Sequence, residues 1–287
     1  MHFHMRSPRA VDGRAQGADM GGMTFPTFFI PHGGGPCFFM NPGAAPDPMW
    51  RPMEAYLKAL IAGLPERPRA ILLVSGHWEE RGFTVHTGTR PPLLFDYYNF
   101  PPHTYQLRWD APGDPALAAR VADLLGAAGF PTASNAERGW DHGVFVPMKV
   151  ALPGADIPTV QLSLRADLDP AAHIAIGRAL APLRDEGVLI IGSGMSFHNL
   201  RERGDHATER ADAFDTWLSA AATDPDPAAR AARLTRWTDA PFARFAHPRE
   251  EHLLPLMVAL GAGGDDIAVC DYRDRVMGWA VSGFRFG

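Results

Sequence analysis

The chain has 287 residues, which fits one large α/β domain or two smaller domains. Its 27 Lys and Arg against 32 Asp and Glu give a formal charge of −5, which does not support nucleic-acid binding. Two cysteines, Cys37 and Cys270, exclude a disulfide framework and a cysteine-rich zinc fold. The chain also has twelve histidines. Imidazole would therefore have to supply most of the ligands of any bound metal.

Residues 1–24 are rich in Gly, Arg and Asp without a periodic pattern, and we expect a flexible N-terminal extension there. This stretch lacks the apolar core of ~7–15 residues that a secretory signal needs. No later segment approaches the ~18 consecutive apolar residues of a membrane helix. His2 and His4 lie in the extension and are assigned no role. The expected domain covers residues 25–287, and the expected compartment is the cytoplasm.

In chain order, short β-rich apolar segments alternate with helical patterns, which is typical of an α/β sheet. The predicted strands are Thr27–Pro31, Ala70–Ser75, Phe83–His86, Tyr105–Trp109, Thr159–Leu164, Val188–Ser193, Ile267–Asp271 and Gly278–Phe284. The predicted helices are Met49–Gly63, Pro115–Gly126, Gly143–Ala151, Pro170–Glu186, Asp205–Ala222, Pro227–Trp237 and Arg249–Gly261. Four strand segments are almost continuously apolar, as expected of central strands covered on both faces. We therefore predict an α/β fold with a central, mostly parallel or mixed sheet flanked by helices.

The stretch 87–113 is a long excursion rich in proline and aromatic residues. Long loops in compact domains are commonly lids or binding loops. A proline-rich cover on the edge of the sheet is the alternative, and the sequence leaves both open. Residues 95–105, with Arg108, could line a pocket that recognises an aromatic ring or a carboxylate.

Three predicted strands run into a small-residue turn and then into a histidine. The segment FFIP is followed by His32 and three glycines, ILLVSG by His77, and VLIIGSGMSF by His198. In an open α/β sheet, ligands bind beyond the carboxyl ends of the strands. The neighbouring glycines permit tight turns and close approach of a ligand to the backbone. A single such histidine is more often a buried, hydrogen-bonded residue, but the repeated pattern favours one shared site.

Two further histidines have alternative interpretations. His252 lies in the first turn of the last predicted helix, where Glu250 and Glu251 suit the positive end of the helix dipole. Helix capping explains His252 as well as membership of the site does, and Glu251 could itself be a carboxylate ligand. His142 opens another predicted helix, with Asp141 before it as a possible N-cap.

The remaining histidines receive no role. His86 alternates with polar neighbours in a predicted strand, which favours a surface position. Four others fall in loops or on solvent faces by pattern: His103, His173, His206 and His247.

Other chemistries fit less well. The sequence has no GxSxG, Walker, HExxH or CxxC motif. The run HGGGP resembles the oxyanion-hole glycines of lipases, but GSGMS lacks the spacing of a nucleophile elbow, and four or five histidines are too many for one triad. Cys37 could be a soft ligand, although a small buried residue is the simpler interpretation. Imidazole, with or without carboxylate, suits Fe(II) or Zn(II) with an open position for substrate.

A collinear set of motifs carries a more specific signal. These motifs are HGGGP, SGHW, FPPHTYQLRWDAPG, GWDHG, PTVQLSL, GSGMSFHNLR and EEHLLPL. Together they resemble the 4,5-DOPA extradiol dioxygenase family, which belongs to the class III, LigB-like ring-cleavage dioxygenases. The resemblance covers roughly residue 25 to the C-terminus. It implies a single α/β domain with the active site at the C-terminal ends of the strands.

The resemblance also implies roles for individual residues. His32, His77 and His252 would be metal ligands, with His252 in the place where more distant LigB-like enzymes carry a glutamate. His198 would act as acid and base, close enough to the metal to be a further ligand. His142 would contact the substrate hydroxyls. HGGGP stands where many relatives have HGSP, which changes the lining of the pocket.

The implied activity is extradiol ring opening. Both atoms of O2 would enter a catechol, DOPA-like or other, to give a muconic semialdehyde-type product. Fe(II) is expected for activity, and Zn(II) is a second ion that the site could hold. The expected partners are a catechol-type small molecule and O2, without nucleic acid or membrane, and the protein would be a monomer or small homo-oligomer. The alternatives are a zinc-dependent hydrolase and a non-catalytic metal-binding protein on the same fold.

Overall fold

The computed structural model describes residues 23–287, so almost all of the predicted extension 1–24, with His2 and His4, lies outside the described residues. The strands are β1 (Thr27–Pro31), β2 (Ala70–Glu80), β3 (Thr84–His86), β4 (Ala133–Asn135), β5 (Thr159–Arg165), β6 (Val188–Gly194), β7 (Ala268–Val276) and β8 (Trp279–Phe286). The helices are α1 (Arg51–Ala62), α2 (Pro115–Ala127), α3 (His142–Ala151), α4 (Pro170–Leu180), α5 (Asp205–Ala222), α6 (Pro227–Thr235), α7 (Ala243–Ala246) and α8 (Leu254–Gly263). Short 3-10 helices cover Cys37–Phe39, Pro48–Trp50, Pro102–Gln106, Ala181–Arg184 and Trp237–Asp239.

One eight-stranded mixed sheet runs through the molecule in the order β4-β3-β5-β2-β6-β1-β8-β7. The four central strands β5, β2, β6 and β1 run parallel to one another. Antiparallel pairing appears only toward the edges, where β3 meets β5 and where β8 meets β1 and β7. The predicted α/β fold with a mixed sheet is confirmed, and it is built as one domain.

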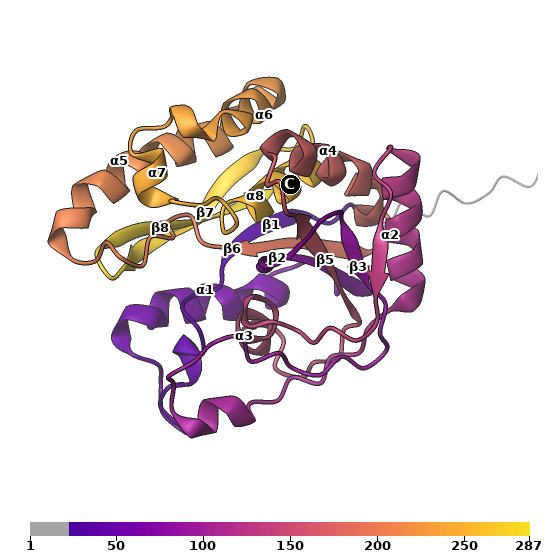
Figure 1. The fold of residues 1–287 in the computed structure, drawn as a ribbon, viewed down its shortest axis with the longest axis horizontal. Coiled ribbons are helices and arrows are strands. Elements are labelled where there is room, and N and C mark those ends of the chain that lie inside the picture. The colour runs from indigo at the N-terminus through magenta and orange to yellow at the C-terminus, as the bar shows by residue number, and fades with distance from the viewer. Residues whose placement is uncertain (1–22) are drawn as a thin grey trace, which may run out of the picture.

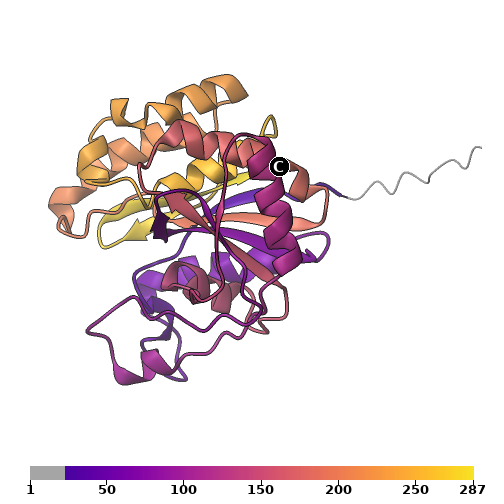
Figure 2. The same ribbon diagram turned by 45° about the vertical axis from the view of Figure 1, so that its right-hand side comes forward.

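Helices cover both faces of this sheet (Figure 1). α4 and α8 pack together on one face, and α1 and α3 pack together on the other. The view turned by 45° shows the same layers, with α2 beside the edge that holds β3 (Figure 2). Because both faces are covered, every residue of β1 and of β6 is buried, as their continuously apolar sequences predict. No helix within residues 23–287 is both long and apolar enough to cross a membrane.

The structure corrects the predicted strands in two ways: one predicted strand is absent, and one observed strand was not predicted. The predicted strand Tyr105–Trp109 is absent: Pro102–Gln106 form a 3-10 helix, and the residues after it have no regular structure. Tyr105, Leu107 and Trp109 are still more buried than the residues between them, so the alternation indicates burial correctly but not strand pairing. The short edge strand β4, which is exposed and has no apolar pattern, was not predicted.

The helix predictions differ from the structure mainly at their ends. Asp169 caps α4 as predicted, because its side chain accepts from the backbone N–H groups of Ala171 and Ala172. α8 begins only at Leu254, and it continues past Gly261. A Cβ on Gly261 would collide with the carbonyl oxygen of Ile174 on α4. Gly261 therefore permits close helix packing rather than ending its helix.

Candidate metal centre

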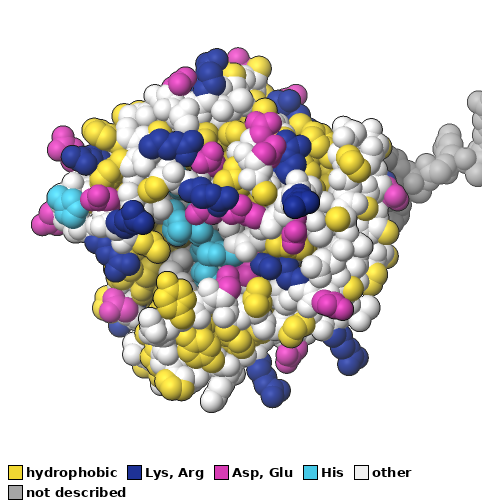
Figure 3. Space-filling model, in the orientation of Figure 1, with side chains coloured by type: hydrophobic (Ala, Val, Ile, Leu, Met, Phe, Trp, Pro, Cys, Tyr) yellow, Lys and Arg dark blue, Asp and Glu magenta, His cyan; other side chains and the backbone are white. Residues whose placement is uncertain are grey.

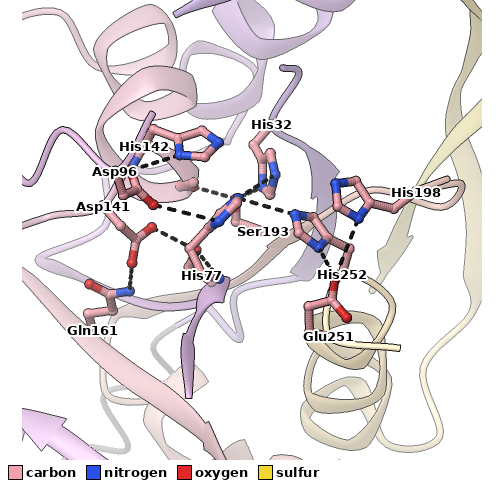
Figure 4. A network of polar contacts seen from close by, with 12 residues as sticks. His32, His77, Asp96, Asp141, His142, Gln161, Ser193, His198, Glu251 and His252 are labelled. Carbon is pink, nitrogen blue, oxygen red and sulfur yellow. Dashed lines mark hydrogen bonds and ion pairs between the residues drawn. The ribbon is translucent and has the colours of Figure 1, made fainter. Parts of the chain in front are cut away.

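Five histidines from five different elements meet at one end of the sheet (Figure 4). His32 follows β1 directly, His77 lies within β2, and His198 follows β6 after a short loop. The other two stand at the beginnings of helices from opposite faces of the sheet. His142 is the first residue of α3, and His252 lies in the turn before α8. The structure thus brings together all five histidines of the predicted site.

Two of these placements correct the sequence analysis. β2 does not end at Ser75 but continues to Glu80, with a register shift between Val74 and Glu79 that contains His77. An irregularity of this kind re-aims side chains within a strand. His252 is not in the first turn of a helix, so helix capping does not explain it.

Glycines on β6 let the turn that carries His252 approach the sheet. A Cβ on Gly194 would collide with the carbonyl oxygen of His252, and one on Gly192 would collide with that of Pro255. The carbonyl of His252 also accepts a hydrogen bond of 3.1 Å from the N–H of Met195. These glycines were expected to admit a ligand to the backbone, but what approaches them is the protein's own chain.

The ring nitrogens of three histidines converge with the spacing of metal ligands. Nε2 of His77 lies 3.2 Å from Nε2 of His32 and 3.2 Å from Nε2 of His252. Nitrogens held ~2.1 Å from a shared ion in tetrahedral or octahedral geometry are roughly 3.0–3.4 Å apart. A single proton on Nε2 of His77 could bridge only one of the two contacts. The spacing therefore fits a cation among the three rings.

Hydrogen bonds at the far side of the rings leave two of these nitrogens without a proton. Ser193 donates its hydroxyl proton to the carbonyl of Gly143, so its Oγ accepts from Nδ1–H of His32 at 3.1 Å. Nδ1–H of His252 donates to Oε1 of Glu251 at 2.9 Å. In a neutral imidazole, a proton on Nδ1 leaves Nε2 as a bare lone pair. Such lone pairs are what a metal ion binds.

Burial keeps the three rings neutral. His32 and His252 are 1% and 3% exposed. Burial, and then the neighbouring histidines, lower the pKa values of both groups well below the ordinary value, and burial lowers the pKa of His77 to about 4. Neutral imidazole is the form that ligates metals, so the donor set and its ionisation state fit a divalent ion.

Two carboxylates lie against the cluster. Oδ1 of Asp96 accepts hydrogen bonds from Nδ1–H of His142 at 2.8 Å and from its backbone N–H at 2.9 Å. Oε1 of Glu251 lies 3.4 Å from Nδ1 of His198, whose ring stacks on that of His252 at a centroid distance of 3.4 Å. Burial by itself raises the pKa of each carboxyl group, but the facing histidines bring it below its ordinary value. Both groups are therefore carboxylates near neutral pH.

The site opens on one face of the molecule. Histidine side chains reach the surface at the centre of this face, between charged side chains above and hydrophobic side chains below (Figure 3). The hydrophobic excursion borders the cluster, since the Tyr97 ring lies 5.9 Å from that of His142. A hollow of about 410 Å³ lies elsewhere, at the ends of α1 and α3, and no histidine lines it. The convergent donors, not the hollow, identify the site.

Comparison with known proteins agrees with this geometry. Residues 26–280 match the family described as the catalytic LigB subunit of aromatic ring-opening dioxygenase. The chain belongs to the LigB family. Enzymes of this family use a metal, and this LigB-family chain is a non-haem extradiol dioxygenase. The resemblance found in the motifs is confirmed.

Several relatives match most of this LigB-family chain. A 4,5-DOPA dioxygenase extradiol of Beta vulgaris is 39% identical over 248 residues, covering 84% of this chain and 87% of that protein. Dioxygenase tasH of Hapsidospora irregularis is 37% identical over 276 residues, covering 91% of this chain and 85% of that protein. The crystal structure of an uncharacterized protein of Escherichia coli K12 superposes with a TM-score of 0.73 at 32% identity, covering 91% of this chain and 99% of that chain.

The sequence analysis assigned no site role to three polar residues of the LigB-family site. Asp96 is the only acidic residue between positions 87 and 109, and that isolation was an available signal. Ser193 lies near the end of an apolar strand, and its sequence context carried no signal of a role in the site. Asp141 precedes α3 as expected, but its buried carboxylate caps nothing: it accepts from Ser75, Arg138 and Gln161 instead. This network lies directly behind His77, whose carbonyl also accepts from Arg138 at 3.1 Å.

Three histidines expected at the surface are buried instead. His86 is 1% exposed and packs against Trp140, and His173 and His247 are both 0% exposed. His173 packs on Phe83, and His247 packs between Phe214 and Trp237. His206 is exposed as predicted, and His103 is half-buried. Cys37 is buried, as the simpler interpretation held. It belongs to neither of the two groups of possible metal donors in the described chain, which are His32, His77 and His142, and His198, Glu251 and His252.

Proposed function

We propose that this enzyme opens the ring of a catechol next to its diol and inserts both atoms of O2, giving a muconic semialdehyde-type product. One observation carries the proposal: Nε2 of His77 lies 3.2 Å from Nε2 of both His32 and His252, two rings whose Nδ1–H groups are already donated to the protein. Membership of the LigB family supports the ring-opening dioxygenase activity. The names of the relatives support a catechol such as DOPA as the substrate.

His32, His77 and His252 would hold Fe(II), and the same donors would accept Zn(II). When bound, the iron supplies the Lewis acidity that ionises a catechol hydroxyl and the redox chemistry that O2 requires. The protein's own contribution is to fix the three rings. Ser193 and Glu251 do this for two of them, because each accepts the Nδ1–H group on the far side of its ring.

His142 and His198 would handle the substrate's protons. Asp96 accepts the Nδ1–H group of His142 and so fixes the ring, which leaves Nε2 as an acceptor for a substrate hydroxyl. His198 would take a catechol proton and return it when the ring opens, acting as general base and then as general acid. Its stacking on His252 supports a further role as a metal ligand.

An oxygen-uptake assay of the Fe(II)-loaded protein against a panel of catechols tests this function. Oxygen consumption matched to a yellow semialdehyde product is the expected result. A zinc hydrolase would turn over substrate without oxygen, and a non-catalytic metal-binding protein would retain metal with no turnover of any catechol. Either outcome contradicts the proposal.

A further inference from the structure

Asp96 and Glu251 lie on opposite sides of the cluster (Figure 4). We propose that they are positioning residues, each joining one proton-handling histidine to one metal-holding histidine. Each carboxylate would then set the orientation of two rings together. The inference rests on the proposed function for the roles of the four histidines. The carboxylate contacts themselves are independent of those roles.

Asp96 uses both of its oxygens. Oδ1 holds His142 through the ring Nδ1–H at 2.8 Å and through the backbone N–H at 2.9 Å. Oδ2 faces Nδ1 of His77 at 3.6 Å, which is an electrostatic contact rather than a hydrogen bond. The rings of His77 and His142 lie 3.9 Å apart between their centroids. The strong contact of Asp96 is therefore to the proton-handling histidine.

Glu251 shows the reverse arrangement and uses one oxygen for both rings. Oε1 accepts from Nδ1–H of His252 at 2.9 Å and lies 3.4 Å from Nδ1 of His198. Its second oxygen, Oε2, lies 3.5 Å from the guanidinium of Arg249, which also pairs with Glu79. The strong contact of Glu251 is therefore to the metal-holding histidine.

These contacts have a chemical consequence. A carboxylate that accepts Nδ1–H fixes the tautomer of the ring and raises the basicity of Nε2. For His252 this strengthens the bond to a metal, and for His142 it strengthens the acceptor that faces a substrate hydroxyl. Removing Glu251 should thus act first on metal affinity, whereas removing Asp96 should act first on turnover.

Two readouts on purified variants separate these effects: Zn(II) affinity by competition with a chromophoric chelator, and kcat and KM of the Fe(II)-loaded enzyme with a catechol. We expect Glu251→Ala to weaken Zn(II) binding ~10–100-fold. We expect Asp96→Ala to lower kcat ~10–100-fold with a small change in KM and a smaller loss of Zn(II) affinity.

Isosteric variants sharpen the test, because the two carboxylates use their oxygens differently. Glu251→Gln keeps Oε1 as an acceptor for both rings, so it should recover much of the Zn(II) affinity lost in Glu251→Ala. Asp96→Asn keeps Oδ1 for His142 but turns an amide N–H toward Nδ1 of His77. It should therefore bind Zn(II) no better than Asp96→Ala.

Neighbouring acidic residues provide matched controls. Glu250 pairs with the exposed Arg244, and Asp110 is an exposed residue near the end of the same excursion as Asp96. Glu250→Ala and Asp110→Ala should leave both readouts unchanged. The inference is overturned if folded Glu251→Ala and Asp96→Ala keep wild-type Zn(II) affinity and kcat, or if only thermal stability falls. Failure of the wild-type enzyme to cleave any catechol would refute the proposed function instead, while the Zn(II) competition would still decide the role of Glu251.

Discussion

Nδ1 of His32 lies 3.1 Å from Oγ of Ser193, and both residues are buried. Because the hydroxyl of Ser193 donates its proton to the carbonyl of Gly143, it can only accept a hydrogen bond from the His32 ring. Ser193→Ala removes that acceptor and frees His32 to take the other tautomer. We expect metal affinity to fall ~10–100-fold, measured by chelator competition.

A second buried strand serine controls for the general effect of losing a hydroxyl. Oγ of Ser163 in β5 accepts a hydrogen bond from the N–H of Thr84. Ser163→Ala should lower the free energy of unfolding by roughly 1 kcal/mol and leave metal affinity unchanged. Equal metal affinity in both variants would show that Ser193 does not orient His32.

His198→Ala tests the acid and base role. The ring stacks on His252 and contacts Glu251, and general acid–base catalysis contributes typically ~10²–10⁴-fold to a rate. We expect kcat for ring opening to fall at least ~100-fold while the metal content, measured by mass spectrometry, stays near that of the wild type. A large loss of metal would instead identify His198 as a ligand. His206→Ala, which removes an exposed histidine paired with Glu202, is the control.

Gly194→Ala tests how the sheet positions His252. The added Cβ would collide with the His252 carbonyl and lie 3.0 Å from the Phe29 ring, so the turn before α8 must move. We expect weaker metal binding and a lower melting temperature. Gly126 is an exposed residue of α2 with nothing within 4 Å of its Cβ position, and Gly126→Ala should raise stability by about 0.5–1 kcal/mol without affecting the metal. Wild-type metal affinity in Gly194→Ala would contradict this view of the turn.

The sequence predicted the parts of the site that follow from sheet geometry. His32, His77 and His198 stand at or near the carboxyl ends of adjacent parallel strands, and such ends share one edge of a sheet. The sequence left alternatives open for His142 and His252, because these residues enter from α3 and from the turn before α8, on opposite faces of the sheet. Only the packing of both helices on the sheet places them together, and no local pattern encodes that packing.

The errors have a common physical cause. His86, His173 and His247 were expected at the surface, yet aromatic side chains from other segments of the chain pack against them and bury them. Asp96 lies in an excursion without regular structure, so no periodicity indicates which way its side chain points. Burial and hydrogen bonding across long sequence distances decide these positions, and single-sequence patterns do not report them.

Acid should destabilise the protein through His173. Its Nε2 accepts from the N–H of Arg165 at 3.2 Å and its Nδ1–H donates to the carbonyl of Asp169 at 2.7 Å, so both bonds require a neutral ring. Burial lowers the pKa of His173 from 6.5 to about 4. Between those pH values the unfolded chain binds a proton that the folded chain does not, so the free energy of unfolding falls as the pH falls. The effect is absent above pH ~6.5 and reaches on the order of 3 kcal/mol near pH ~4.

Urea unfolding at several pH values, on the wild type and on His173→Gln, isolates this contribution. Glutamine does not titrate, so the variant should be less stable at pH ~7.5 but should lose less stability on acidification, by up to the same ~3 kcal/mol. All other titrating groups, including the site histidines and Asp271, whose pKa burial raises to about 6, are common to both proteins and cancel in the difference. Parallel pH profiles for the two proteins would mean that His173 has the same pKa in the folded and unfolded chains, which would contradict a buried neutral ring held by both hydrogen bonds.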